Sequence, residues 1–162
     1  MAAPFLTGII VWTIRLASEE AIMFSTIVLA LDGSEGSRRA LPLAADLAER
    51  DGARIVAVHV RELIAAKAGT YPIRADEGEI EAAVRREVED LSARGLDATL
   101  ETAAVAMGGP AHAIADIARA AGADLIVVGT RGHGPVAGLL LGSVTQRLLH
   151  IATCPVLAVP PS

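Results

Sequence analysis

The sequence predicts an α/β fold, a single domain in which helices flank a five-stranded parallel sheet. Short apolar runs alternate along the chain with longer segments whose apolar residues recur at helical spacing, and this alternation is typical of parallel strands joined by right-handed crossovers. The chain has 162 residues, enough for one domain with a substantial core. Only 2% of its residues are aromatic, so the core must be built from small aliphatic side chains. No internal repeat or second domain is visible.

The first strand and helix follow from the apolar pattern. Residues 26–31 are an apolar run and are expected as the first strand, which ends at Asp32. Residues 37–50 carry alanine and leucine at helical spacing and are expected as the first helix, closed by Gly52. Asp32 stands at the carboxyl end of a buried strand, where ligands collect in open α/β sheets, but Asp32 or Ser34 is equally suited to capping the helix. From the residues alone, the two roles are balanced.

The middle of the chain holds two further strands and one helix. Residues 54–60 are expected as the second strand, and His59 is interpreted as a partly buried strand residue because no second metal-binding residue type stands at a recognisable spacing. Residues 62–75 are expected to be irregular because they contain glycine and proline. Residues 76–94 are expected as a helix whose many charges form a solvated outer face, and residues 98–105 as an edge strand.

The last part of the chain repeats the alternation twice. Residues 110–121 are expected as a helix, 125–128 as a strand buried on both faces, 143–151 as the final helix and 155–159 as the final strand. Strands one to three can wind outward in one direction and strands four and five in the other, which gives the order 3-2-1-4-5. The carboxyl ends of the first and fourth strands then flank the switch point of the sheet, so a ligand cleft is expected between them.

A long glycine-punctuated loop follows the fourth strand. Gly129 and Gly132 are separated by two residues, Gly132 and Gly142 by nine, and Ser143 follows at once. Glycine lets backbone N–H groups approach an anion closely, and a helix that opens at Ser143 favours negative charge at its start, so the loop suits phosphate. A P-loop is excluded because no Gly-Lys-Ser or Gly-Lys-Thr occurs, and this loop lacks the dinucleotide order Gly-x-Gly-x-x-Gly.

This loop spacing resembles that of the universal stress protein family, specifically its ATP-binding branch, and the resemblance extends from Met23 to Pro160. It implies a Rossmann-like domain of the adenine nucleotide α-hydrolase-like type that binds ATP, or AMP or ADP, with or without Mg²⁺. In such a domain the residue matching Asp32 contacts the adenosine part of the nucleotide, and the residue matching Val60 lies against adenine. The nucleotide-binding residues expected on this basis are Leu31, Asp32, Val60, Val128, Gly129, Arg131, Gly132, Gly142, Ser143, Val144 and Thr145.

Two functions from different classes fit this cleft. The resemblance implies a regulatory binding module of the stress response that holds the nucleotide and signals to partners, and the alternative is a slow ATP hydrolase or an ATP-dependent transferase. The binding module is favoured because the loop offers no lysine and no dedicated carboxylate, the only lysine of the chain being Lys67. His133 is the one candidate acid or base in the loop, and it is interpreted as solvent-facing since no orienting partner is evident. No catalytic or metal-binding residue is expected, and the missing dinucleotide fingerprint disfavours a flavin- or nicotinamide-binding domain.

Composition and the chain ends bear on partners and location. The net charge is −5 and the arginines are scattered, so nothing indicates a nucleic-acid footprint. Cys154 is the only cysteine, so an internal disulfide is excluded, in agreement with a reducing cytoplasm. Cys154 itself is interpreted as a small core residue. The apolar run from Phe5 to Ile14 is too short to span a bilayer, and residues 1–22 are expected to be a poorly ordered extension of a nucleotide-binding domain at residues 23–162. As in the family, the edge strand at Val156 to Val159 is expected to form a homodimer contact.

Overall fold

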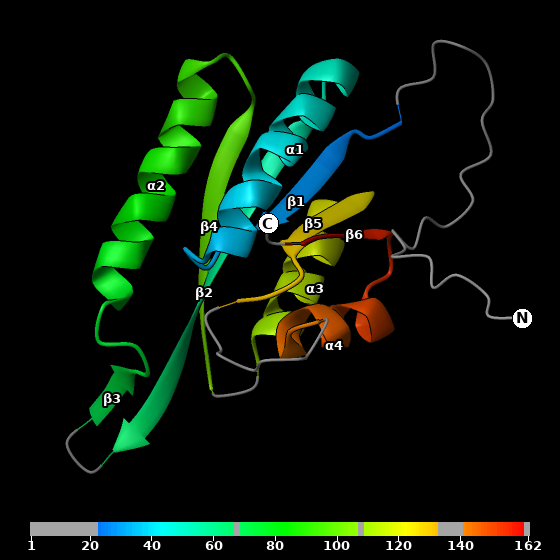
Figure 1. Cartoon of the computed structure of the whole chain (residues 1–162). Coiled ribbons are helices and arrows are strands. Elements are labelled where there is room, and N and C mark those ends of the chain that lie inside the picture. The colour runs from blue at the N-terminus through cyan, green and yellow to red at the C-terminus, as the bar shows by residue number, and fades with distance from the viewer. Residues whose placement is uncertain (1–22, 67–68, 107–108, 133–140, 161–162) are drawn as a thin grey trace, which may run out of the picture.

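The computed structural model describes residues 23–66, 69–106, 109–132 and 141–160 (Figure 1). Its strands are β1 (Thr26–Ala30), β2 (Arg54–Ala66), β3 (Gly69–Pro72), β4 (Ala98–Ala106), β5 (Leu125–Gly129) and β6 (Val156–Val159). Its helices are α1 (Glu35–Asp51), α2 (Glu77–Ala93), α3 (Pro110–Ala121) and α4 (Ser143–Ile151). The expected N-terminal extension and His133 lie outside the described residues.

The parallel strands lie in the predicted order. Across the sheet the strands run β4–β2–β1–β5–β6, and each neighbouring pair is parallel. When only the strands predicted from the sequence are numbered, this is the order 3-2-1-4-5, which is confirmed. Because β1 and β5 are neighbours at the centre of the sheet, their carboxyl ends meet at one edge.

The prediction of an irregular segment at residues 62–75 was wrong. β2 continues to Ala66, and β3 pairs antiparallel with its end, with Ile64 opposite Tyr71. The sheet of the described residues therefore has six strands rather than five and is mixed rather than wholly parallel. Gly69 has a φ of 136°, which L side chains rarely adopt and which lets the chain return at the hairpin. The hairpin projects beyond the rest of the sheet (Figure 1), and its Ile64 and Tyr71 side chains are exposed.

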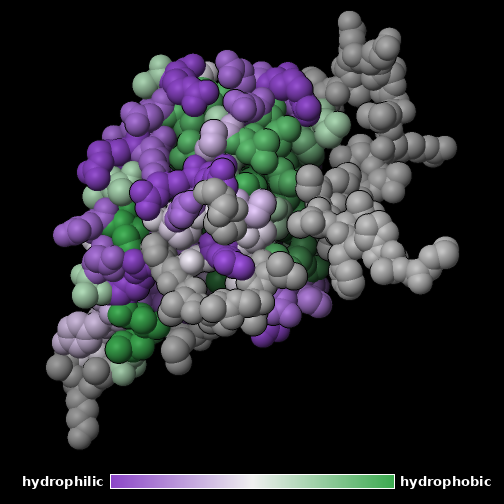
Figure 2. Space-filling view, viewed as in Figure 1, coloured by the Kyte–Doolittle hydropathy of each residue, from purple (hydrophilic) through white to green (hydrophobic). Residues whose placement is uncertain are grey.

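Two helices cover each face of the sheet (Figure 1). Alternate residues of a strand point to opposite faces. Ile27 and Leu29 of β1 pack with α1 and α2, while Val28 and Ala30 pack with α3 and α4. The outer faces of α1 and α2 are largely hydrophilic (Figure 2). Because β1 and β5 are buried on both faces, a ligand can reach them only at their ends.

The Asp51 carboxylate ties the end of α1 to the start of β1. Its Oδ2 accepts a 3.1 Å hydrogen bond from the Phe24 N–H, and its Oδ1 lies 2.6 Å from the Arg50 Nε. The hydrogen-bonded Arg50 side chain, followed by the Phe24 N–H, holds the pKa of Asp51 below its ordinary value. A pKa that is depressed in the folded state adds stability that is fully present above the unfolded-state pKa and is lost as the pH falls through the folded-state pKa.

We expect Asp51→Asn to lower the free energy of unfolding by about 1 kcal/mol at neutral pH, because the amide nitrogen that replaces one carboxylate oxygen cannot accept a hydrogen bond and the remaining bond loses its charge. At about pH 2.5, below the unfolded-state pKa, the difference from the parent protein should shrink. Urea unfolding of both proteins at the two pH values measures this. A difference of the same size at both would contradict an origin in the carboxylate charge.

Candidate functional site

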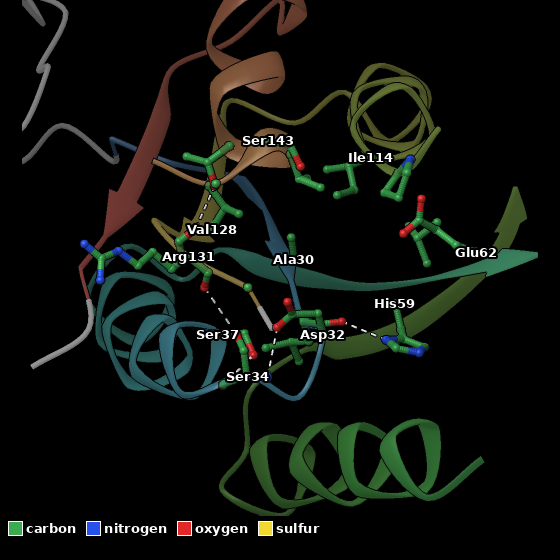
Figure 3. A pocket seen from close by; sticks show the side chains of 18 of the residues that line it. Ala30, Asp32, Ser34, Ser37, His59, Glu62, Ile114, Val128, Arg131 and Ser143 are labelled. Atoms are coloured by element: carbon green, nitrogen blue, oxygen red, sulfur yellow. Dashed lines mark hydrogen bonds between the residues drawn. The ribbon is translucent and has the colours of Figure 1, made fainter. Parts of the chain in front are cut away.

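One cavity lies at the carboxyl edge of the sheet, between the ends of β1 and β5 (Figure 3). Its volume is about 420 Å³, in the range of small-molecule sites. All eleven residues predicted from the sequence as nucleotide contacts line it, and their role in binding stays a prediction. One wall that the sequence did not indicate comes from the β2–β3 hairpin and the first turns of α2 and α3. The lining residues on this wall are Glu62, Ile73, Arg74, Glu77, Ile80, Pro110 and Ile114.

The start of α4 faces the cavity beside the end of β5. Gly142 is the N-cap of α4, and its N–H donates a 2.6 Å hydrogen bond to the Thr130 carbonyl. The Thr145 hydroxyl donates a 2.7 Å hydrogen bond to the Gly129 carbonyl. These two bonds fix the first turn of α4 against β5. Because the first N–H groups of a helix have no acceptor within it, the turn that begins at Ser143 has the chemistry that suits an anion.

Two of the three motif glycines, Gly129 and Gly132, are closely packed. A Cβ on Gly132 would lie 2.7 Å from the Asp32 Oδ2, and a Cβ on Gly129 would lie 2.7 Å from the Gly36 carbonyl carbon. Gly142 has more room, with its nearest neighbour at 3.4 Å. Among the described glycines, positive φ angles occur only at positions outside this motif. The first glycine of the motif therefore lets α1 pack against β5, a role that the sequence analysis missed.

The turn after β1 separates the two roles considered for Asp32 and Ser34. Ser34 is the N-cap of α1, and its Oγ accepts a 3.2 Å hydrogen bond from the Ser37 N–H. Asp32 accepts a 2.9 Å hydrogen bond from the Ser34 N–H and lines the cavity. The Ser34 hydroxyl also lies 3.4 Å from the Arg131 carbonyl, to which it donates. Figure 3 shows the Arg131 side chain extending away from the other labelled side chains, so Arg131 meets the cavity through its backbone.

Val60 presents its backbone to the cavity on the other side of β1. Even-numbered residues of β2 bond to β1, as the 2.9 Å hydrogen bond from the Leu31 N–H to the Val58 carbonyl shows. β1 ends at Ala30, which pairs with Val58. Val60 is the next residue of β2 whose backbone groups point to the β1 side, and it lies beyond the last β1–β2 pair. Among the described residues, no backbone hydrogen bond joins the Val60 N–H to the Leu31 carbonyl, the next acceptor of this series. The N–H and C=O of Val60 are therefore directed into the open space past the end of β1.

A buried histidine–glutamate pair stands beside Val60. The His59 Nδ1 lies 2.8 Å from the Leu31 carbonyl oxygen, and the His59 Nε2 lies 2.6 Å from the Glu77 Oε1. The two side chains are 3% and 7% exposed. Two predictions are corrected here: His59 is fully rather than partly buried, and Glu77 lies inside rather than on the solvated face of α2. No local pattern signals this contact, because the residues are 18 positions apart on different elements.

Side chains that could bind a metal ion are dispersed over the described part of the chain. Nowhere in it do three or more His, Cys, Asp or Glu residues group so that they could hold a metal ion. Cys154 is half-buried, and burial raises the pKa of its thiol, which disfavours a reactive thiolate. A search of the described helices finds none with the length and apolar character needed to cross a bilayer.

Comparison with known proteins shows which family the chain belongs to. The model of the universal stress protein family matches residues 23–160. A relative from Thermus aquaticus, the universal stress protein in the QAH/OAS sulfhydrylase 3' region, is 40% identical over 138 residues, which cover 85% of this chain and 99% of the relative. Universal stress protein YxiE from Bacillus subtilis is 34% identical over 147 residues, with coverage of 85% and 99%.

A solved structure adds a likeness in three dimensions. The crystal structure of a universal stress protein in complex with cAMP has a TM-score of 0.65 to this chain and is 28% identical, covering 86% of this chain and 99% of that one. The mostly parallel sheet flanked by helices is thus shared with a protein of this family. From the family match and the identity of these relatives, the chain belongs to the universal stress protein family.

Proposed function

We propose that this protein binds an adenine nucleotide, ATP in particular, in the cavity between β1 and β5, and acts in the cytoplasm as a regulatory binding module of the stress response. One observation carries the proposal. Two sets of backbone hydrogen-bonding groups, at Val60 and in the first turn of α4, lie on either side of β1 and line the same cavity. The first set suits a nucleobase and the second suits phosphate.

The backbone of Val60 matches the hydrogen-bonding edge of adenine. The exocyclic amine of adenine is a donor and the adjacent ring nitrogen is an acceptor, so they complement a carbonyl and an N–H presented side by side. The apolar side chains of Ile73 and Ile114 line the same cavity and supply contacts for the faces of the ring. In this arrangement the base is recognised by main-chain groups and enclosed by aliphatic ones.

The first turn of α4 matches the phosphates. Its N–H groups and the helix dipole favour an anion, and the Ser143 side chain lines the cavity at the same place. Gly142 carries no side chain to cover these groups. If Mg²⁺ accompanies the nucleotide, it needs no dedicated group of protein carboxylates, because it is held largely by phosphate and water oxygens.

The comparisons support an adenine nucleotide as the ligand class. The relative of known structure that is 28% identical was solved in complex with cAMP, which shares its adenosine and one phosphate with ATP. The preference for ATP rests on the spacing of the loop from Gly129 to Ser143.

Two measurements on the purified full-length chain test the proposal. Mass spectrometry of the nucleotide released on denaturation should detect ATP or another adenine nucleotide, and calorimetric titration of the nucleotide-free protein with ATP and Mg²⁺ should give saturable binding. Phosphate release by the loaded protein should stay at the level of buffer, whereas steady turnover would favour the hydrolase alternative. Absence of saturable binding for ATP, ADP and AMP alike would contradict the proposed function.

The same proposal includes a homodimer formed through β6. In the described residues β6 pairs with β5 on one side only, and its four residues are half-buried. The Ile126 N–H bonds to the Pro155 carbonyl and the Thr130 N–H to the Val159 carbonyl, so odd-numbered residues of β6 bond to β5. The Ala158 N–H therefore points to the open edge, where a second copy of the strand can pair.

We expect the protein to be a dimer by light scattering at high micromolar concentration, and Ala158→Pro to be a monomer that keeps its fold. Proline removes an edge-facing N–H without removing a hydrogen bond to β5. Circular dichroism and the urea midpoint check the fold of the variant. A parent protein that scatters as a monomer, or a variant that remains a dimer, would contradict pairing through this edge.

A further inference from the structure

We infer that His59 and Glu77 are a positioning pair for the nucleotide: they occupy the Leu31 carbonyl and so keep the Val60 backbone available to the base. The inference rests on the proposed function and names two residues that the sequence analysis assigned no role. It starts from the hydrogen bonds around the end of β1. There the parallel ladder stops although its next donor and acceptor are both in place.

The Leu31 carbonyl is the acceptor that a regular ladder would give to the Val60 N–H. The Leu31 N–H bonds to the Val58 carbonyl. In a regular parallel ladder the Val60 N–H, two residues further along β2, would then donate to the Leu31 carbonyl. The His59 ring takes this place instead, with its Nδ1 at 2.8 Å from the Leu31 oxygen. His59 and Asp32 accordingly lie next to each other at the end of β1 (Figure 3). A side chain thus completes β1, and within the part of the chain that the structure describes the main chain of Val60 is left unpaired toward the cavity.

Glu77 fixes the ring in this orientation. A carbonyl oxygen can only accept, so the His59 Nδ1 must carry a hydrogen, and a proton must also lie between Nε2 and the Glu77 oxygen 2.6 Å away. Both side chains are buried, so neither can exchange its partner for water without opening the start of α2. The pair therefore links the first turn of α2, and with it the cavity wall at Ile73 and Ile80, to the end of β1.

Replacing the pair by apolar residues tests the inference. In His59→Phe combined with Glu77→Leu no buried charge is left without a partner, so the fold should survive, and the Leu31 carbonyl becomes free to bond to the Val60 N–H.

The probes are ATP and ITP, since the base of ITP has the reverse donor and acceptor order at the edge that faces Val60. In the parent we expect ATP to bind about tenfold tighter than ITP. In the double variant ATP should bind about tenfold weaker and the preference should vanish, while ITP affinity stays the same.

Two single variants separate positioning from general stability. Glu77→Gln keeps a side chain that can donate to the His59 Nε2, so both hydrogen bonds remain and the ratio of ATP to ITP affinity should equal that of the parent. Glu89→Gln changes an exposed side chain on the same helix, away from the cavity, and should have no effect on the ratio. Amide exchange in the nucleotide-free parent gives a readout that needs no variant. The Val60 amide should exchange faster than the paired Val58 amide.

The outcomes distinguish this inference from the proposed function. A parent protein that binds neither nucleotide overturns the proposed function and this inference with it. A parent that prefers ATP, combined with a folded double variant that retains both the affinity and the preference, overturns only the role of the pair. A Val60 amide protected as strongly as that of Val58 in the nucleotide-free parent also overturns it, because its N–H would then already be bonded.

Discussion

Gly142→Val is expected to abolish the ATP-dependent rise in melting temperature while leaving the fold intact. Gly142 has φ −70° and ψ 160°, which valine adopts readily, and its Cβ would meet no atom closer than 3.4 Å. The added methyl groups would stand at the N-cap of α4, over the N–H groups proposed to bind phosphate. Ligand at about a hundred times its dissociation constant stabilises the parent by roughly 2.7 kcal/mol, or roughly 5–10 °C in melting temperature.

Differential scanning fluorimetry with and without ATP and Mg²⁺ measures this shift. Gly78→Val is the matched control, because it adds the same side chain at an exposed position of α2 where a Cβ would meet nothing within 4 Å. Ser143→Ala should weaken the shift less, since it removes one hydroxyl and leaves the backbone groups in place. If the valine variant shifts as much as the parent, the phosphate site is not at the start of α4.

Gly129→Ala is expected to lower the free energy of unfolding by about 1–3 kcal/mol in the absence of any nucleotide. The new Cβ would stand 2.7 Å from the Gly36 carbonyl carbon and 2.9 Å from the Ser37 nitrogen, both backbone atoms of α1. To relieve this clash α1 would have to move away from β5, which would disturb the packing of the alanines on its buried face. The nucleotide site would be disturbed as well, because Thr145 bonds to the Gly129 carbonyl.

The urea midpoint of the variant, set against Gly78→Ala, gives the size of the effect. Gly78 is in the first turn of α2, so alanine there removes only glycine's entropy penalty and should be neutral or slightly stabilising. Equal midpoints for Gly129→Ala and the parent would mean that α1 tolerates displacement at no cost. That result would leave Gly129 with a role in nucleotide binding alone and none in the packing of α1.

The parallel part of the fold was predictable because its signals are local. Pro110 at the first turn of α3 and Gly122, in the left-handed conformation at its end, mark the helix in the sequence as they do in the structure. The runs at β1 and β5 are apolar throughout, as strands buried on both faces must be. The strand order then followed from connection rules that depend on chain direction and not on side-chain detail.

The wall of the cavity was not predictable for the opposite reason. The end of β2 and all of β3 are stabilised by pairing with each other, and their glycine and proline resemble those of a loop when the pairing is unknown. Glu77 is one of two acids in the first turn of α2, and only its contact with His59 distinguishes it from its exposed neighbour Glu79. Such features arise from tertiary partners, for which one sequence holds no periodic signal.

Main-chain groups at Val60 and in the first turn of α4 have a consequence for mutagenesis. Alanine scanning removes side chains beyond Cβ and leaves every backbone N–H and C=O in place, so a scan of this cavity would find few sensitive positions even if ligand affinity were high. Substitutions that add atoms, at Gly132 and Gly142, or that move a strand end, at His59, are the informative ones. For the same reason the wall residues Ile73 and Ile114 can be exchanged for other aliphatic residues to redesign the pocket without altering which edge of a base it reads.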